Sequence, residues 1–364
     1  MRSPTVSAVL SLLSPRIPFD RASDWDVSGL HLGDASRSVG RLGVCHELTD
    51  EVIDRLAAER VDAVVVYHPL VFRPTRTITA GPGPGGRAFR LIREGISVIV
   101  AHTAFDMAAG GTADALASVL ELAEVRPFGP AEASPQVKVV TFAPAHSVEA
   151  LVDAMASAGG GTIGNYSACH FRVEGVGGFD AGPGSSPIVG AHGRNREAES
   201  RIEMVAPAVA RDGVVAALVD AHPYEEPAYD VYPVRSNEGF IGRIGTRPGS
   251  LSELVELVGL TLGGQGLRVA GDRTAAAGAV AVIPGSGGSF VAAAAREGAK
   301  VLVTGDVPHH SMVEALDRGM AVVDAGHAAT ERPGMTALVS TVAGAVGDAV
   351  EVVDLTGIDP TPWR

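Results

Sequence analysis

The chain has 364 residues, a net charge of −13 and 46% hydrophobic residues, an ordinary globular balance that predicts roughly two or three domains. The acidic balance argues against a broad nucleic-acid-binding face, because such a face needs clustered lysine and arginine to replace the counterions of phosphates. Two cysteines, Cys45 and Cys169, are too few for a disulfide framework or a thiolate zinc site, so we expect a cytoplasmic protein. No stretch reaches the roughly 20 apolar residues that would span a membrane.

The first feature along the chain is the apolar run Val6–Leu13. With Arg2 as its charge it is similar to a weak signal peptide, but no small-x-small cleavage site follows before Trp25. We therefore expect an amphipathic first helix here.

Strand and helix patterns then alternate through the first third of the chain. Apolar runs predict three strands, at Arg41–Glu47, Val61–Tyr67 and Ile96–Ala101. Helices are expected between and after them, over Asp50–Arg60, over Arg87–Glu94 and beyond Gly110-Gly111. Continuous apolar strands separated by helices indicate a parallel sheet that is covered on both faces.

The last third repeats this order of elements. Its predicted strands are Ala279–Ile283, Lys300–Thr304 and Ala321–Asp324. Helices are expected after Ser289, over Ser311–Arg318 and after Thr330, which is suited to cap a helix that has Glu331 and Pro333 in its first turn.

The middle of the chain has a different pattern. It predicts strands and helices in two strand–helix–strand halves: Val137–Phe142, Ser147–Ser157, Arg201–Ala206, Arg211–Ala221 and Tyr229–Val234. This order suggests a small ferredoxin-like α+β insert. We therefore expect an α/β protein with an N-terminal lobe over residues 1–130, an insert over 131–236 and a C-terminal lobe over 237–364.

Histidines and carboxylates follow several predicted strands. His68 and His327 each come after a strand, Glu331 is four residues beyond His327, and Asp106 follows the strand Ile96–Ala101. Neutral imidazoles and carboxylates are common ligands of zinc, iron and manganese. Each residue alone is better explained as a polar loop residue with a local hydrogen bond. Together, at equivalent strand ends, they favour a site, although the spacing alone leaves both explanations open.

Other polar segments also allow two explanations. His310 could orient or protonate a substrate or begin a helix, and His102 could enter a pocket or cap a turn. The segment Pro284–Ser289 could hold phosphate on its backbone, but it lacks the Gly-Lys-Ser/Thr ending of a nucleotide loop, which favours a tight turn. The segment His222–Glu226 could be a gate or a contact between subunits.

Motifs along nearly the whole chain are similar to those of one family, the dinuclear metal-centre family of type 2 GTP cyclohydrolase I homologues. The matching segments are Trp25–Leu30 with Gly33-Asp34, Tyr67–Phe72, Ala101–Asp106 with Gly110-Gly111, Ile163–Ser167, Ala221–Glu226, Thr304–His310 and Asp324–Glu331.

This resemblance implies that the two α/β lobes form one metal-binding unit and that the insert is similar to PII and CutA domains. It also implies a ring-shaped homohexamer whose metal sites face an inner cavity. The implied metal ligands are His68, Asp106, His327 and Glu331, which would hold one or two divalent ions of zinc, iron or manganese.

The sequence departs from the family pattern at two positions. Many members have two adjacent histidines where this chain has Tyr67-His68, and a phenol binds metals well only as phenolate, with an ordinary pKa of about 10. We therefore expect one well-held ion and a weaker or absent second ion. Val27 stands where an asparagine is common, which removes a hydrogen bond that such an asparagine would make.

The function that these features favour is a metal-dependent hydrolase of a small phosphate-bearing or nucleotide-like substrate. Bound ions would lower the pKa of a water to about 7, with His310 as a candidate acid. The family name suggests opening of a guanine ring, but no motif here indicates purine recognition. The alternative is a non-enzymatic metal-binding or regulatory ring whose insert is a sensor or docking surface. Membranes and nucleic acids are not expected partners.

Overall fold

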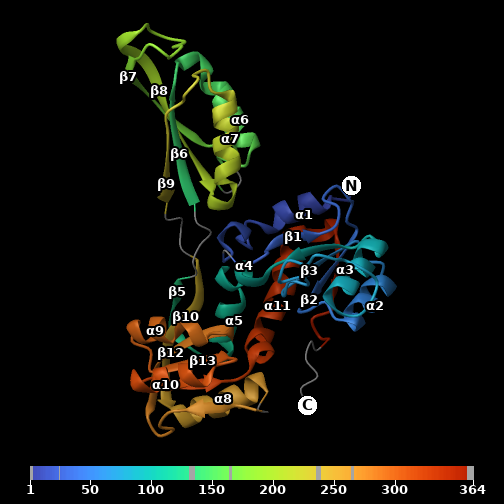
Figure 1. Cartoon of the computed structure of the whole chain (residues 1–364). Coiled ribbons are helices and arrows are strands. Elements are labelled where there is room, and N and C mark those ends of the chain that lie inside the picture. The colour runs from blue at the N-terminus through green and yellow to red at the C-terminus, as the bar shows by residue number, and fades with distance from the viewer. Residues whose placement is uncertain are drawn as a thin grey trace. The chain divides into compact units, whose positions relative to one another are not determined.

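The structure is a computed structural model that describes residues 3–23, 25–130, 136–163, 166–234, 239–263 and 266–358. Gly164 and Asn165 of the insert motif lie outside these ranges, as do the predicted domain-boundary residues 131, 236 and 237. The chain forms two compact units (Figure 1). The first unit contains Met1–Ala131 and Glu238–Arg364, and the second contains Glu132–Asn237.

The first sheet of the first unit has the strand order β1-β4-β3-β2-β15. Its strands are β1 (Gly29–Leu32), β2 (Arg41–Cys45), β3 (Ala63–Val66), β4 (Ser97–Val100) and β15 (Glu351–Asp354). Strands β15, β2, β3 and β4 run parallel to one another, and β1 pairs antiparallel with β4. The prediction of parallel strands is confirmed for β2, β3 and β4, while β1 adds an antiparallel edge.

Helices cover both faces of this sheet, as predicted. Ala63 and Val65 of β3 face a core shared with α1 (Val6–Leu13), α4 (His102–Met107) and α11 (His327–Val346). Val64 and Val66 face the opposite core, which is shared with α2 (Asp50–Ala58) and α3 (Gly83–Glu94). Because successive strand residues point to opposite faces, a sheet buried on both sides needs a continuous apolar run.

The second sheet of this unit has the order β11-β14-β13-β12-β10-β5. Its strands are β5 (Ala123–Pro130), β10 (Phe240–Ser250), β11 (Arg268–Ala270), β12 (Ala276–Ser286), β13 (Val301–Gly305) and β14 (Ala321–Asp324). Strands β12, β13 and β14 are parallel, and the other pairings are antiparallel. Helices α5 (Thr112–Val119) and α8 (Leu251–Leu262) cover one face, and α9 (Val291–Arg296) and α10 (His309–Asp317) cover the other.

Helix α11 contacts both sheets of the first unit. The predicted start of this helix after Thr330 is wrong, because α11 begins at His327 and has Gly326, at φ +89°, as its N-cap. The hydroxyl of Thr330 donates to the carbonyl of His327 at 2.7 Å and accepts the N–H of Gly285 at 2.9 Å. Thr330 is therefore the fourth residue of the helix and does not cap it.

The second unit contains an antiparallel sheet with the order β7-β8-β6-β9. The elements follow one another as β6 (Gln136–Ala143), α6 (Val148–Ser157), β7 (His170–Ala181), β8 (Gly193–Pro207), α7 (Arg211–Ala221) and β9 (Tyr229–Val234). Both helices pack on the sheet through a core that includes Leu151, Met155 and Leu218. In all described ranges of the chain, no helix is long and apolar enough to cross a membrane.

Two glycines of α11 differ in what surrounds them, and this difference gives a prediction for stability. A Cβ on Gly334 would lie 2.6 Å from Cγ2 and 2.7 Å from Cα of Thr112 in α5, whereas a Cβ on Gly344 would meet no atom within 4 Å. We expect Gly334→Ala to lower the free energy of unfolding by about 1–3 kcal/mol through overpacking. Gly344→Ala should raise it by about 0.5–1 kcal/mol, because alanine favours the helix. Urea unfolding of both variants measures this, and equal effects would contradict the close contact of α11 with α5.

Candidate metal centre

Two histidines follow adjacent parallel strands and point to the same place. His46 comes directly after β2, and His68 follows β3 by two residues. The N–H of His68 donates to the carbonyl of His46 at 2.9 Å, which continues the pairing of the two strands. The two imidazole rings are stacked, with centroids 5.0 Å apart and planes at 24°.

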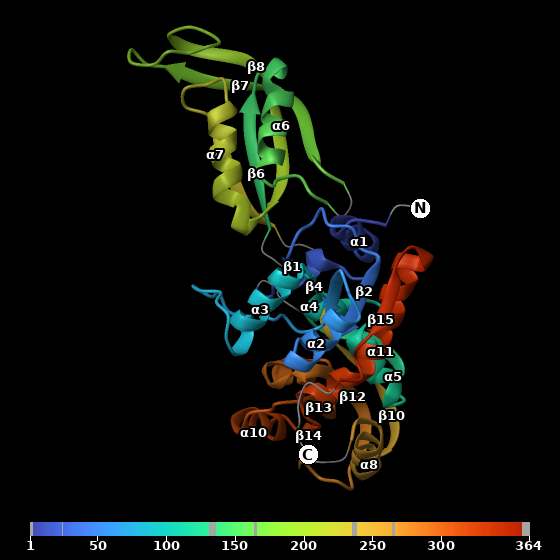
Figure 2. The ribbon, with the colours of Figure 1, turned by 90° about the vertical axis from the view of Figure 1, so that its right-hand side faces the viewer.

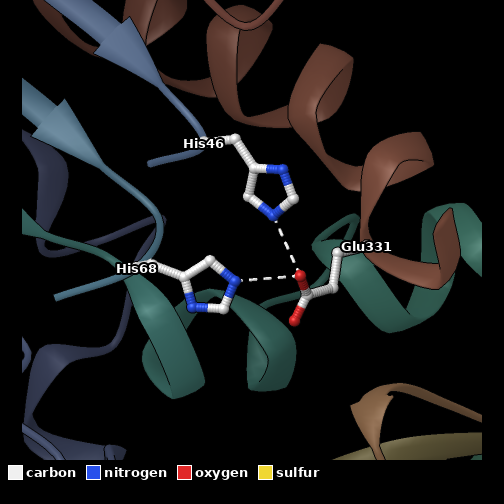
Figure 3. Close-up of side chains that lie close together, drawn as sticks. All are labelled: His46, His68 and Glu331. Atoms are coloured by element: carbon white, nitrogen blue, oxygen red, sulfur yellow. Dashed lines mark hydrogen bonds and ion pairs between the residues drawn. The ribbon is translucent and has the colours of Figure 1, made fainter. Parts of the chain in front are cut away.

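Glu331 of α11 completes this cluster from the other end of the chain. Its Oε2 lies 2.9 Å from Nε2 of His46 and 3.0 Å from Nε2 of His68. Figure 3 shows both imidazoles directed at this one oxygen. The three ligand atoms lie within 4.8 Å of one another, and the side chains of His46 and Glu331 are each 3% exposed. Two of the three side chains are therefore buried, while the side chain of His68 is 21% exposed.

The charge of Glu331 is maintained despite its burial. Burial alone would raise the pKa of the carboxyl, but the charge of His68 and hydrogen bonds from His327, His46 and His68 hold that pKa well below its ordinary value. Two imidazole nitrogens and a carboxylate oxygen are a donor set that suits zinc, iron and manganese. The residues present thus fit a divalent ion in both geometry and chemistry.

His327 binds the second oxygen of the same carboxylate. Its Nε2 lies 3.0 Å from Oε1 of Glu331, and its Nδ1 lies 2.8 Å from Oδ2 of Asp306. Burial lowers the pKa of His327, but the hydrogen bonds and charges of Glu331 and Asp306 outweigh it and raise that pKa to about 9. Asp306 has a φ of +52°, a strained conformation for a residue with a side chain.

The segment Pro284–Ser289 lies against these side chains. A Cβ on Gly285, at φ +66°, would lie 2.7 Å from Oε1 of Glu331 and 3.2 Å from Nε2 of His327. The N–H of Gly285 donates to Thr330, so this amide is already used inside the protein. The glycine is therefore explained by its close approach to the metal-ligand candidates. The tight turn expected over this segment is wrong, because Pro284–Ser286 ends β12 and a 3-10 helix follows over Gly288–Phe290.

Asp106 lies near the cluster but is bonded to Tyr67. The hydroxyl of Tyr67 donates to Oδ1 of Asp106 at 2.6 Å, and both residues are buried. Burial raises the pKa of Asp106 to about 6, although hydrogen bonding from Tyr67 and the charge of His102 oppose the shift. Of the four ligands expected from the family, His68 and His327 each contact the carboxylate of Glu331. The carboxylate of Asp106 is bonded to Tyr67 and is not part of the cluster of His46, His68 and Glu331.

The ring of His102 is oriented by the buried carboxylate of Asp26. Its Nδ1 lies 2.7 Å from Oδ1 of Asp26, whose side chain is fully buried. Asp26 also accepts hydrogen bonds from the hydroxyls of Ser28 and Thr103. Burial would raise the pKa of Asp26, but its bonds to His102, Thr103 and Ser28 lower it to about 2. The ring of His102 lies 5.5 Å from that of His68, centroid to centroid.

Two other candidates lie elsewhere. His310 is exposed in the first turn of α10, and no contact between described residues joins it to the cluster, so its role as an acid stays a prediction. His222 lies in the second unit, where its Nε2 donates to the carbonyl of Phe142 at 3.1 Å and its Nδ1 accepts the N–H of Tyr224. These bonds explain His222 as part of the local structure of that unit.

His46 is a ligand candidate that the sequence pattern did not predict. It lies inside the apolar run Arg41–Glu47, which predicts a strand and gives no separate role to its histidine. A signal was present, because β2 and β3 are neighbouring parallel strands and a histidine at the carboxyl end of each reaches the same edge of the sheet.

Comparisons with known proteins agree over nearly the whole chain. The sequence model of the family Duf34/NIF3 (NGG1p interacting factor 3) matches residues 4–360. A Bacillus subtilis protein named GTP cyclohydrolase 1 type 2 homolog is 34% identical over 88% of this chain and 87% of its own length. A Mycobacterium leprae protein of the same name is 36% identical over 100% of this chain and 96% of its own length.

Solved structures give the same result for the fold. The crystal structure of a Bacillus cereus protein related to NIF3 has a TM-score of 0.67 and 32% sequence identity, with 100% of both chains covered. The extent of these matches leads to one conclusion: the chain belongs to the Duf34/NIF3 family, among relatives that are named GTP cyclohydrolase 1 type 2 homologs.

Proposed function

We propose that this protein binds a divalent metal ion through His46, His68 and Oε2 of Glu331. The observation that carries the proposal is the convergence of two imidazole nitrogens on one buried carboxylate oxygen. A second, weaker ion would be held by His327 and Oε1 of Glu331, since Asp106 is occupied by the hydroxyl of Tyr67. The centre is therefore asymmetric.

The reaction that suits such a centre is hydrolysis of a small phosphate-bearing or nucleotide-like substrate. A bound divalent ion supplies a Lewis acid and a water whose pKa is lowered to about 7. Glu331 brings the negative charge that balances the ion, Asp306 fixes the ring of His327, and Asp26 fixes the ring of His102. The name shared by the relatives, GTP cyclohydrolase 1 type 2 homolog, supports the nucleotide class of substrate.

A second candidate function is supported by the second unit. Its strand–helix–strand–strand–helix–strand order suits a ferredoxin-like, PII-like insert. It also contains a pocket of about 590 Å³, lined in part by Phe142, Phe179, Glu199 and Tyr224. The alternative is therefore a metal-binding regulatory protein, assembled as a homohexameric ring, in which the insert binds a small-molecule signal.

Metal content and turnover of variants separate these functions. We expect His46→Ala, His68→Ala and Glu331→Ala each to lose most of the bound metal, because each removes a donor from a three-donor cluster. His146→Ala, at an exposed histidine of the second unit, is the control and should keep its metal. The measurements are elemental analysis of the purified proteins and hydrolysis of a panel of nucleotides and phosphoesters, with and without chelator.

Each outcome of that experiment has a definite meaning. Metal-dependent turnover that is lost together with the metal supports the hydrolase. Full metal binding without turnover on the panel supports the regulatory function. Wild-type metal content in both His46→Ala and Glu331→Ala would refute the proposed ligand set.

Tyr67 accounts for the asymmetry, and its replacement tests this. Tyr67→His removes the hydroxyl that binds Asp106 and adds an imidazole beside it, so we expect the second ion to bind more tightly. The number of ions bound per chain in a zinc titration should rise, and Tyr67→Phe, which frees Asp106 but adds no imidazole, should raise it less. An identical number of ions in wild type and Tyr67→His would count against this explanation.

The pKa of His327 predicts a pH-dependent release of protons. Because this pKa is about 9 in the metal-free protein, His327 carries a proton at pH 7, and an ion that binds its Nε2 must displace that proton. Zinc binding in excess should therefore release about one more proton from wild type than from His327→Ala at pH 7. The difference should vanish as the pH rises past 9. Calorimetry in buffers of different ionisation enthalpy measures it, and an absent difference at pH 7 would exclude His327 as a ligand.

A further inference from the structure

Three aromatic rings meet beside the metal centre. Trp25 lies 5.8 Å from Phe72 and 5.8 Å from His102, and Phe72 lies 6.4 Å from His102, measured between ring centroids. The rings are steeply inclined to one another, at 67°, 77° and 86°. Trp25 is 56% exposed and Phe72 is 48% exposed, although large aromatic side chains contribute most to stability when they are buried.

His102 connects these rings to the metal centre. Its imidazole is held by the fully buried carboxylate of Asp26 and lies 5.5 Å from the ring of His68. Its backbone has a φ of +25°, which is rare for a residue with a side chain. Strain of this kind persists where the surrounding structure holds it in place, and it is concentrated at functional sites. His102 is therefore fixed at the border of the metal centre, and the rings of Trp25 and Phe72 lie against it.

Positive charge lies close to Phe72. Together with Arg73 and Arg76, Phe72 lines a pocket of about 540 Å³ in the segment between β3 and α3, which extends from the first unit in Figure 2. Among the residues that the structure describes, neither guanidinium has an ion pair or hydrogen-bond partner. Free guanidinium groups in a chain with a net charge of −13 favour an anionic ligand such as phosphate.

The charges decide between two ligands that aromatic clusters commonly bind. A quaternary ammonium group also binds among aromatic rings, but Arg73 and Arg76 would repel it. A planar heteroaromatic ring that carries a phosphate satisfies both the aromatic surface and the guanidinium groups. Stacking of such rings on aromatic side chains is favourable and tolerates different bases.

We propose that Trp25 and Phe72 bind the planar heteroaromatic ring of a nucleotide-like ligand, with its phosphate toward Arg73 and Arg76. The ring, and not the phosphate, then lies next to His102 and the metal centre. This subsite adds a class of ligand to the proposed function, and its part in a reaction rests on that function. Its binding properties can be measured whether or not the protein holds metal.

Fluorescence of Trp25 tests the proposal. The chain has two tryptophans, Trp25 and Trp363, so the experiment uses full-length Trp363→Phe protein, in which Trp25 is the remaining indole. The probes are guanosine monophosphate, cytidine monophosphate, guanosine and ribose 5-phosphate, with excitation at the red edge of indole absorption, where the bases do not absorb. We expect saturable quenching by the two nucleotides and no quenching by ribose 5-phosphate.

Substitutions then identify the contacts. In the same background, Phe72→Ala should weaken nucleotide binding at least about five-fold, the loss expected for one base–aromatic stack. The control is Leu260→Ala, which removes another exposed apolar side chain (78% exposed) in the same unit and should leave the Kd unchanged. Arg73→Ala and Arg76→Ala should weaken binding of guanosine monophosphate and leave binding of guanosine unchanged.

The subsite and the metal centre can fail independently. All titrations are repeated after chelation, and metal content is measured in parallel. Loss of the proposed ligand set with intact ring binding would reject the metal proposal alone. The ring subsite is rejected if neither nucleotide gives saturable quenching, if ribose 5-phosphate quenches equally well, or if Phe72→Ala binds like the Leu260→Ala control.

Discussion

A buried carboxylate needs partners for its charge, and in this protein the partners of Glu331 are three imidazoles. His46 and His68 share one of its oxygens, and His327 takes the other. An unpaired carboxylate at 3% exposure would cost several kcal/mol. The position of Glu331 therefore requires that the two adjacent strands and the last long helix come together.

The fold meets this requirement by joining the ends of the chain. Strand β15, from the C-terminal part, extends the N-terminal sheet beside β2, and α11 packs on that sheet through residues such as Met335 and Leu338. The first residue of α11 is His327, so the same helix delivers its first turns to the metal centre. Because β15 of the C-terminal part pairs with β2 of the N-terminal part, this sheet holds candidate ligands from both ends of the chain close together.

Much of the fold was predictable, because strands buried on both faces leave continuous apolar runs and surface helices leave periodic ones. The site was less predictable, because it depends on side-chain contacts between distant segments. The sequence around Tyr67 and the sequence around Asp106 do not indicate the hydrogen bond between these residues. The apolar residues next to His46 predict a strand and do not indicate a ligand. The predicted start of α11 was wrong because threonine is a common N-cap residue. The hydroxyl of Thr330 instead lies inside the helix and accepts the N–H of Gly285. Local patterns thus predict elements well, while the partners of a polar side chain require the tertiary structure.

The central claim concerns where an ion binds, and anomalous scattering locates it most directly. A crystal of the zinc-loaded protein, measured on both sides of the zinc absorption edge, should show a strong peak between Nε2 of His46, Nε2 of His68 and Oε2 of Glu331. A weaker peak, or none, is expected between His327 and Oε1 of Glu331. A strong peak at Asp106 with none at His46 would contradict the account, since it would require Tyr67 to release the carboxylate to which it is bonded here.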